Sequence, residues 1–138
     1  MSAPATPREI LTTLHELTLS DAAATVDLYA EDGVHELPFA PPGAPKRLDG
    51  REAIRALMNA QGSGPSPVEY QAFENVVVWD TTDPEVIIAE YELVGKVVGT
   101  GAQFRVPNLL VLRVREGKIL LTRSYFNPSQ FAELLPTG

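Results

Sequence analysis

The sequence contains no cysteine, only two histidines and few basic residues. Without cysteine, a disulfide framework, a thiolate nucleophile and a cysteine-based metal site are excluded. The 11 lysines and arginines are scattered and are outnumbered by 18 aspartates and glutamates, so the net charge is −7. A nucleic-acid or anionic-membrane surface needs clustered basic residues, and we expect neither partner. A small or neutral partner fits this charge better.

Long apolar runs and cofactor motifs are also lacking. No stretch approaches the roughly 18 apolar residues of a membrane-spanning helix, and residues 1–10 contain no apolar core of signal-peptide length. We therefore expect a cytoplasmic protein. The two histidines, His15 and His35, fall on different predicted elements without a third ligand at a suitable spacing, so no metal is expected. No glycine-rich phosphate loop opens a helix, and we expect no cofactor.

The length of 138 residues and the hydrophobic content of 44% suit one domain with a single core, spanning residues 1–138. Three helices are predicted in the first half of the chain. The first begins with a capping box from Thr6 to Glu9, the second begins at Ser20-Asp21 and runs to about Asp32-Gly33, and the third begins at Asp49. Their apolar residues recur at helical spacing, with Ile54, Leu57 and Met58 forming the buried stripe of the third.

From Val68 onward the sequence is typical of β-structure. Four segments rich in branched and aromatic residues are separated by short turns: Val68 to Trp79, Val86 to Val98, Gln103 to Arg115 and Lys118 to Phe126. Short turns between consecutive strands predict an antiparallel meander. The expected fold is α+β, with three N-terminal helices packed on one face of a curved antiparallel sheet. Asn127 before Pro128 predicts the cap of a final helical turn.

Three motifs in this order carry a family resemblance: YAEDGVHELPF at Tyr29 to Phe39, DGREAIRALM at Asp49 to Met58, and REGKILLTRSYFNP at 115–128. The chain resembles the nuclear transport factor two-like superfamily, and within it the ketosteroid isomerase and SnoaL-like polyketide cyclase branches. The resemblance implies a cone-shaped barrel, a pocket for a small hydrophobic molecule, and a homodimer formed through the convex face of the sheet.

The chain departs from its relatives at two catalytic positions. Leu37 stands where ketosteroid isomerases carry the aspartate that abstracts a proton. Ser124 stands where the phenazine-biosynthesis branch has a glutamate, so the acid chemistry of that branch is not implied either. Apolar and polar lining of the pocket is expected at Leu37, Phe39, Leu57, Met58, Leu110, Thr122 and Phe126.

His35 is the candidate acid-base residue. It is expected on a crossing strand, with Leu37 and Phe39 on the same face, and an imidazole titrates near neutral pH. The alternative is a partly buried histidine that is hydrogen-bonded to a neighbour. Glu36 should point to the opposite face and is a reserve acid only if a bulge rotates it.

Asn108 is the candidate donor to a substrate oxygen. It is the single amide in an apolar row on its strand and lies near the position where the isomerases keep a protonated aspartate. The alternative is a buried amide that is satisfied by backbone or water. Ser124 could orient a ligand beside it. Glu90 and Glu92 should face outward, provided that the strand register does not slip by one residue.

Two functions remain open. In the first, the protein is a cofactor-independent isomerase, cyclase or dehydratase that acts on a polyketide-like or steroid-like carbonyl compound, with His35, Asn108 and Ser124 as catalytic residues. In the second, it is a non-catalytic binding module for an apolar small molecule.

Overall fold

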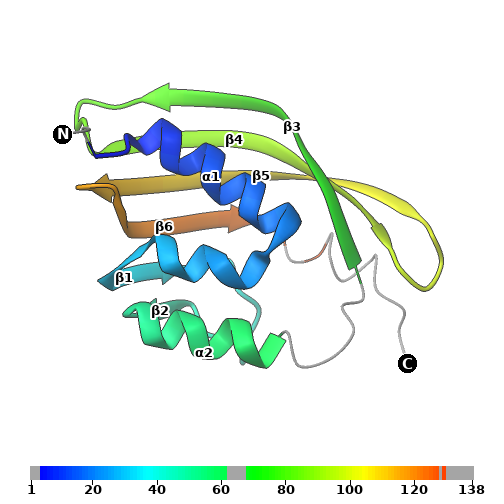
Figure 1. Ribbon diagram of the computed structural model, residues 1–138. Coiled ribbons are helices and arrows are strands. Elements are labelled where there is room, and N and C mark those ends of the chain that lie inside the picture. Colours follow the sequence, from blue (N-terminus) through cyan, green and yellow to red (C-terminus); the bar gives the residue numbers. More distant parts are fainter. Residues whose placement is uncertain (1–3, 62–67, 128, 130–138) are drawn as a thin grey trace.

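The computed structural model describes residues 4–61, 68–127 and 129. In these residues two α-helices and a 3-10 helix lie over one face of a curved six-stranded sheet (Figure 1). The elements in chain order are α1 (Pro7–Ser20), η1 (Ala22–Leu28), β1 (Tyr29–Glu36), β2 (Arg47–Asp49), α2 (Arg51–Gln61), β3 (Val68–Asp80), β4 (Val86–Val97), β5 (Gln103–Arg115) and β6 (Lys118–Phe126). The α+β fold class is therefore confirmed.

The sheet has the strand order β2-β1-β6-β5-β4-β3. Strands β3 to β6 form the predicted antiparallel meander, with β5 and β6 at the predicted residues. The pairing of β1 with β6 is parallel, however, because the chain crosses over between them. The sheet of the described residues is also open, since β2 and β3 stand at opposite edges. It is thus a curved mixed sheet and not a closed antiparallel barrel.

Helix α1 begins as the sequence predicts. Thr6 Oγ1 accepts a hydrogen bond from the Glu9 backbone N–H at 3.2 Å, and Glu9 Oε1 accepts one from the Thr6 N–H at 3.0 Å. This reciprocal capping box satisfies two backbone donors that the first helical turn leaves unpaired. Ile10 and Leu11 then bury the inner face of the helix against the sheet.

The second helix is shorter than predicted. It is a 3-10 helix that ends at Leu28, and Tyr29 to Gly33 belong to β1 instead. Tyr29 pairs with Ile119 of β6 and is buried, so sheet pairing overrides the helical signal of the sequence. Gly33 permits this close pairing, because a Cβ at that position would lie 2.8 Å from the Ile119 carbonyl oxygen.

Other element boundaries follow the sequence with small differences. Helix α2 begins after Gly50, which has a φ of +93°, while the predicted cap Asp49 ends β2 and forms an ion pair with Arg47 at 2.8 Å. Asn127 Oδ1 accepts a hydrogen bond from the Ser129 N–H at 2.9 Å, as a cap would. The rest of the predicted final helical turn lies outside the described residues. No helix in the described part of the chain is long and apolar enough to cross a membrane.

The main core lies between the helices and the inner face of the sheet. On β4 this face carries Ile87, Ala89 and Tyr91, all buried, so the predicted register is confirmed. Glu90 and Glu92 point outward, where Glu90 Oε2 accepts a hydrogen bond from Trp79 Nε1 at 2.6 Å. The homodimer expected through this outer face stays a prediction.

A bulge in β3 changes which side chains of this edge strand face α1. Between the pairs Glu74↔Glu92 and Val77↔Glu90, two residues of β3 oppose the single residue Tyr91 of β4. Asn75 takes up the extra length with a φ of +54°, a conformation that asparagine tolerates better than most residues. As a result, Val76 and Val78 face α1 on the same side as Phe73, which precedes the bulge.

Candidate functional site

The inner face of the sheet carries a hydrogen-bonded trio centred on Thr122 of β6. Thr122 Oγ1 lies 2.7 Å from His35 Nδ1 and 2.6 Å from the Tyr29 hydroxyl oxygen. His35 and Thr122 are direct partners across the β1–β6 pair, and Tyr29 comes from the start of β1. The threonine is 1% exposed, so this polar group lies within the apolar core. Both the neighbour-bonded histidine and the candidate acid-base histidine of the sequence analysis are compatible with this geometry.

Burial sets the protonation of the trio. It lowers the pKa of His35 from the ordinary value of 6.5, which keeps the imidazole neutral at pH 7. Burial also raises the pKa of Tyr29 to about 12, although the hydrogen bond with Thr122 acts in the opposite direction. A neutral imidazole donates from one ring nitrogen and accepts at the other. When Nδ1–H donates to Thr122, Nε2 is a base; when Thr122 donates to Nδ1, Nε2 carries the proton.

A second trio on the same face connects Ser124, Asn108 and Tyr91. Asn108 Nδ2 donates to the Tyr91 hydroxyl oxygen at 2.6 Å, and Ser124 Oγ donates to Asn108 Oδ1 at 3.4 Å, which is long for such a bond. Burial raises the pKa of Tyr91 to about 12, so its phenol stays protonated. Because Asn108 uses one amide hydrogen and Tyr91 accepts, each side chain retains a further hydrogen to donate.

The two trios are neighbours but His35 and Asn108 do not meet. Thr122 pairs with Leu112, whereas Asn108 pairs with Phe126 four residues farther along β6. At about 3.3 Å per residue this offset is roughly 13 Å, and β1 and β5 are separated by roughly another 10 Å across the sheet. Ser124 lies between them, since it is two residues from Thr122 on the same face and contacts Asn108. Ser124 is thus the member of the second trio that lies nearest to Thr122 along β6.

Three of the seven predicted lining residues lie on this inner face, namely Leu110, Thr122 and Phe126. Leu110 is buried opposite Ser124, and Phe126 is half-buried opposite Asn108. Met58 packs against the main core, while Leu57 is half-buried on the same helix, α2. Their contact with a ligand stays a prediction.

The predicted positions of Leu37 and Phe39 are wrong. Strand β1 ends at Glu36, and the Ala40 N–H donates to the Leu37 carbonyl oxygen at 3.0 Å, so a turn replaces the expected strand. Phe39 is 57% exposed, and its ring centroid lies 5.4 Å from that of Tyr125. Tyr125 alternates with the inward-facing residues of β6 and therefore points to the outer face. His35 thus shares no strand face with these two residues.

Glu36 points away from the inner face, as predicted. Its carboxylate lies 3.1 Å from Arg123 and 3.6 Å from Arg47. Two guanidinium groups therefore hold its carboxylate on the side away from His35.

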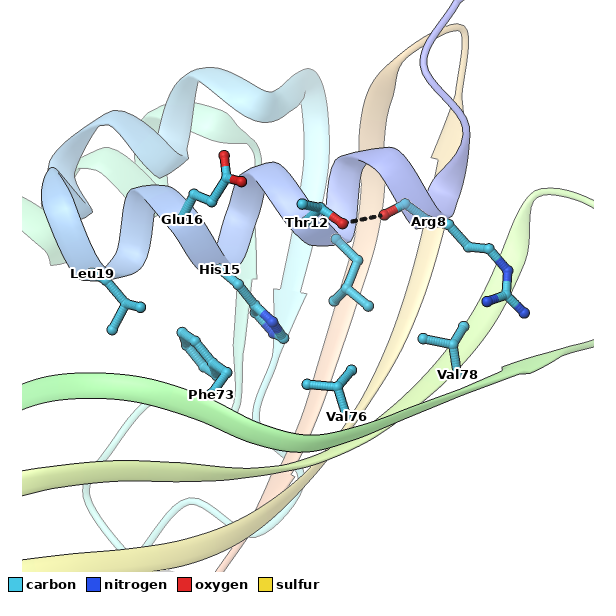
Figure 2. Close-up of a pocket in the computed structure, with 9 residues that line it drawn as sticks. Arg8, Thr12, His15, Glu16, Leu19, Phe73, Val76 and Val78 are labelled. Atoms are coloured by element: carbon cyan, nitrogen blue, oxygen red, sulfur yellow. Dashed lines mark hydrogen bonds between the residues drawn. The ribbon is translucent and has the colours of Figure 1, made fainter.

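A cavity of about 410 Å³ lies elsewhere, between α1 and the bulged strand β3 (Figure 2). His15 of α1 reaches into it and stacks on Phe73, with ring centroids 3.8 Å apart and ring planes 3° apart. The rings of Tyr91 and His15 form a T-shaped pair with centroids 4.6 Å apart. Burial lowers the pKa of His15 to about 4, and its Nε2 atom is buried with no hydrogen-bond partner in the described part of the chain.

Sequence reasoning missed three participants in these arrangements. Tyr29 was placed on a helix, so its hydroxyl was not considered. Tyr91 was placed on the inner face, but no signal connected it with Asn108 before the strand register was known. His15 was weighed only as a metal ligand. Within residues 4–61, 68–127 and 129, no three histidine, aspartate or glutamate side chains gather in a way that could hold a metal ion.

Comparisons with known proteins agree on one family. The family model described as the SnoaL-like domain matches residues 12–122. The chain is 37% identical over 131 residues to an uncharacterised PhzA/B-like protein of Pseudomonas aeruginosa, covering 93% of this chain and 89% of that one. A solved structure of a candidate isomerase from Bacillus subtilis superposes with a TM-score of 0.82 at 29% identity, covering 93% and 91%.

A further structure shows the same fold at lower identity. A candidate polyketide cyclase from Pseudomonas putida superposes with a TM-score of 0.73 at 19% identity, covering 96% of this chain and 99% of that one. The matched residues include Tyr29, His35 and Thr122 of the first trio and Tyr91 and Asn108 of the second, but end before Ser124. The chain belongs to the SnoaL-like domain family.

Proposed function

We propose that this protein is a cofactor-independent isomerase or cyclase that moves a proton at a carbon next to a carbonyl group. Its substrate would be a hydrophobic compound of the polyketide-like or steroid-like class. Membership of the SnoaL-like family supports this class of activity, as do the structural neighbours described as a candidate isomerase and a candidate polyketide cyclase.

The observation that carries the proposal is the half-buried, neutral His35 with its Nδ1 atom bonded to Thr122. Because Nδ1 is engaged, Nε2 is the atom that would exchange a proton with a substrate. In the first step the C–H bond breaks, its proton moves to Nε2, and its electron pair forms the enolate. The imidazolium then returns the proton to the substrate at another carbon. The negative enolate would offset the cost of a charged imidazolium in apolar surroundings.

The developing negative charge needs a hydrogen-bond donor near His35. Ser124 is the nearer candidate. It lies two residues from Thr122 on the same face of β6, and Thr122 is the strand partner of His35. Its present bond to Asn108 is long, so its hydroxyl could turn toward a substrate oxygen. Asn108 and Tyr91 would bind a second oxygen farther along an extended substrate. This arrangement assigns Ser124 the role that the sequence analysis gave mainly to Asn108.

The proposal is tested by solvent exchange, which needs no knowledge of the natural product. Bicyclic aromatic ketones such as 1-indanone and 1-tetralone are incubated with the protein in D₂O, and NMR follows deuterium incorporation next to the carbonyl. We expect catalysed exchange that falls by about 100-fold or more in His35→Asn, since general acid-base groups contribute 10²–10⁴. Asparagine places a polar atom near the position of Nδ1 and so retains the contact with Thr122. Equal exchange in the wild type and His35→Asn would overturn the role of His35.

The alternative, a non-catalytic binding module, is favoured by one observation: the cavity of about 410 Å³ is distant from His35 in the fold and has mostly apolar walls. Saturable ketone binding without any catalysed exchange by the wild type would support this alternative.

A further inference from the structure

The Tyr29 hydroxyl group depends on one partner to accept its hydrogen. Tyr29 is 6% exposed, and burial raises its pKa to about 12, so the phenol keeps its proton at neutral pH. In the described part of the chain, this hydroxyl bonds only to Thr122 Oγ1, at 2.6 Å. A buried donor without an acceptor is unfavourable and rare in proteins. This favours a bond in which Tyr29 donates and Thr122 accepts.

The hydrogen of Thr122 is then left with one acceptor. Thr122 is 1% exposed, and its Oγ1 atom has two partners among the described residues, the Tyr29 hydroxyl group and His35 Nδ1 at 2.7 Å. Since Tyr29 donates in the first of these bonds, Thr122 is free to donate in the second. His35 Nδ1 then accepts without carrying a hydrogen, and the neutral ring has its single proton on Nε2.

A hydrogen on Nδ1 does not fit this trio. The two bonds use two hydrogens, one from Tyr29 and one from Thr122. A third hydrogen on His35 Nδ1 would leave one of the three without an acceptor among the described residues. The carboxylate of Glu36 offers no alternative, because it lies on the opposite face and bonds to Arg123 at 3.1 Å. The trio thus disfavours every form of His35 that carries a proton on Nδ1.

We propose that Thr122 is a positioning residue that, together with Tyr29, holds resting His35 with its proton on Nε2. This inference rests on the proposed function, in which Nε2 must be free to take the proton of the C–H bond. The resting tautomer therefore cannot begin the reaction. One proton must first leave Nε2 and one must join Nδ1, with water as the carrier, and Nδ1–H then donates to Thr122. Because this reversal leaves one hydrogen of the trio unpaired, the form of His35 that acts as a base is a minor one.

The resting tautomer can be measured directly in the wild-type protein. The ¹⁵N chemical shifts of a histidine ring, and the couplings of its nitrogens to the ring protons, distinguish a nitrogen that carries hydrogen from one that does not. At slightly alkaline pH, we expect His35 Nε2 to carry the proton and Nδ1 to carry none. A proton on Nδ1 would overturn the inference. The measurement involves no ketone and no turnover, so its result is independent of the deuterium exchange that tests the proposed function.

A matched pair of variants at position 122 tests the cause. Asparagine and aspartate have nearly the same size, but only asparagine can donate a hydrogen when aspartate is ionised. In Thr122→Asn, the amide oxygen can accept from Tyr29 and the NH₂ group can donate to Nδ1, so the proton should stay on Nε2. In Thr122→Asp, the carboxylate can accept from both Tyr29 and Nδ1–H, so the proton should move to Nδ1. The same tautomer in both variants would contradict the positioning role.

Ketone exchange by the same two variants tests the consequence. We expect Thr122→Asp to exchange deuterium into 1-tetralone about tenfold faster than Thr122→Asn, because an unpaired hydrogen no longer disfavours the base form. A proton that moves to Nδ1 without faster exchange would contradict the claim that the resting tautomer is inactive. If the buried carboxylate prevents Thr122→Asp from folding, the tautomer of the wild type decides the inference by itself.

Discussion

His35 and His15 are both half-buried imidazoles whose pKa values are lowered by desolvation, but their surroundings differ in one respect. His35 has a hydroxyl partner at Nδ1, and that partner is itself bonded to Tyr29. His15 is held by ring contacts alone, and its Nε2 atom has no partner among the described residues. The bond at Nδ1 orients the His35 ring and leaves Nε2 for proton transfer, whereas ring contacts alone hold His15 between α1 and β3. The same residue type is therefore expected to do chemistry on β1 and to contribute packing on α1.

Acidification is expected to have the largest effect on stability, and it tests the two histidines together. An unfolded histidine has a pKa of about 6.5, whereas that of folded His15 is about 4. Below pH 6.5 the unfolded state therefore binds more protons, so the free energy of unfolding decreases as the pH falls. For His15 this loss should level off near pH 4 and reach at most about 3 kcal/mol. Urea unfolding at a series of pH values measures it.

Two variants separate the contributions of His15 and His35 to this pH dependence of stability. The wild type and both variants contain the same carboxylates, so a difference between them reports on the histidine that was replaced. His15→Phe should remove the larger part of the pH dependence, since the lowering of the His15 pKa is the larger of the two. His35→Asn should remove a smaller part. If His35→Asn abolished the pH dependence of stability and His15→Phe preserved it, His35 and not His15 would have the more strongly lowered pKa.

Thr122→Val should have the next largest effect. Valine has nearly the same shape but leaves the Tyr29 hydroxyl and His35 Nδ1 without their shared partner, both in the core. We expect a loss of about 2 kcal/mol in the free energy of unfolding, together with reduced ketone exchange. Thr13→Val, at a helix position where the hydroxyl bonds only to the Glu9 carbonyl, is the control and should change stability by less than about 0.5 kcal/mol. Equal losses of stability in Thr122→Val and Thr13→Val would show that the bonds of Thr122 to Tyr29 and His35 stabilise the fold no more than an exposed helix hydroxyl does.

Tyr91→Phe should have the smallest effect and sharpens the boundary between the two regions. The ring remains against His15, but Asn108 loses its acceptor. We expect a loss of about 1 kcal/mol in the free energy of unfolding, which urea unfolding measures. Unchanged stability would mean that the bond between Tyr91 and Asn108 contributes little to the fold.

The fold could be predicted from the sequence where local signals and tertiary packing agree. The capping box at Thr6, the four strands of the meander and the inward position of Ala89 are of this kind. The prediction failed where pairing with a distant strand decides the outcome. Tyr29 follows a helical pattern in the sequence but belongs to β1. It pairs there with Ile119 of β6, which is 90 positions farther along the chain.

The candidate site was predictable residue by residue but not as an arrangement. Alternation placed Asn108, Thr122 and Ser124 on one face, which the strand pairs confirm. Their separation from His35 depends on the offset between strands, which alternation does not specify. The cavity was beyond sequence reasoning, because it depends on one extra residue in β3 that turns Val76 inward.

The most direct test of the account is an NMR titration of both histidine rings, alone and with 1-tetralone. Both rings should titrate below pH 6.5, with His15 near pH 4. The ketone should shift the resonances of His35 and leave those of His15 unchanged. A His35 ring that titrates at the ordinary value and ignores the ketone would contradict the central claim that it is the proton carrier of this protein.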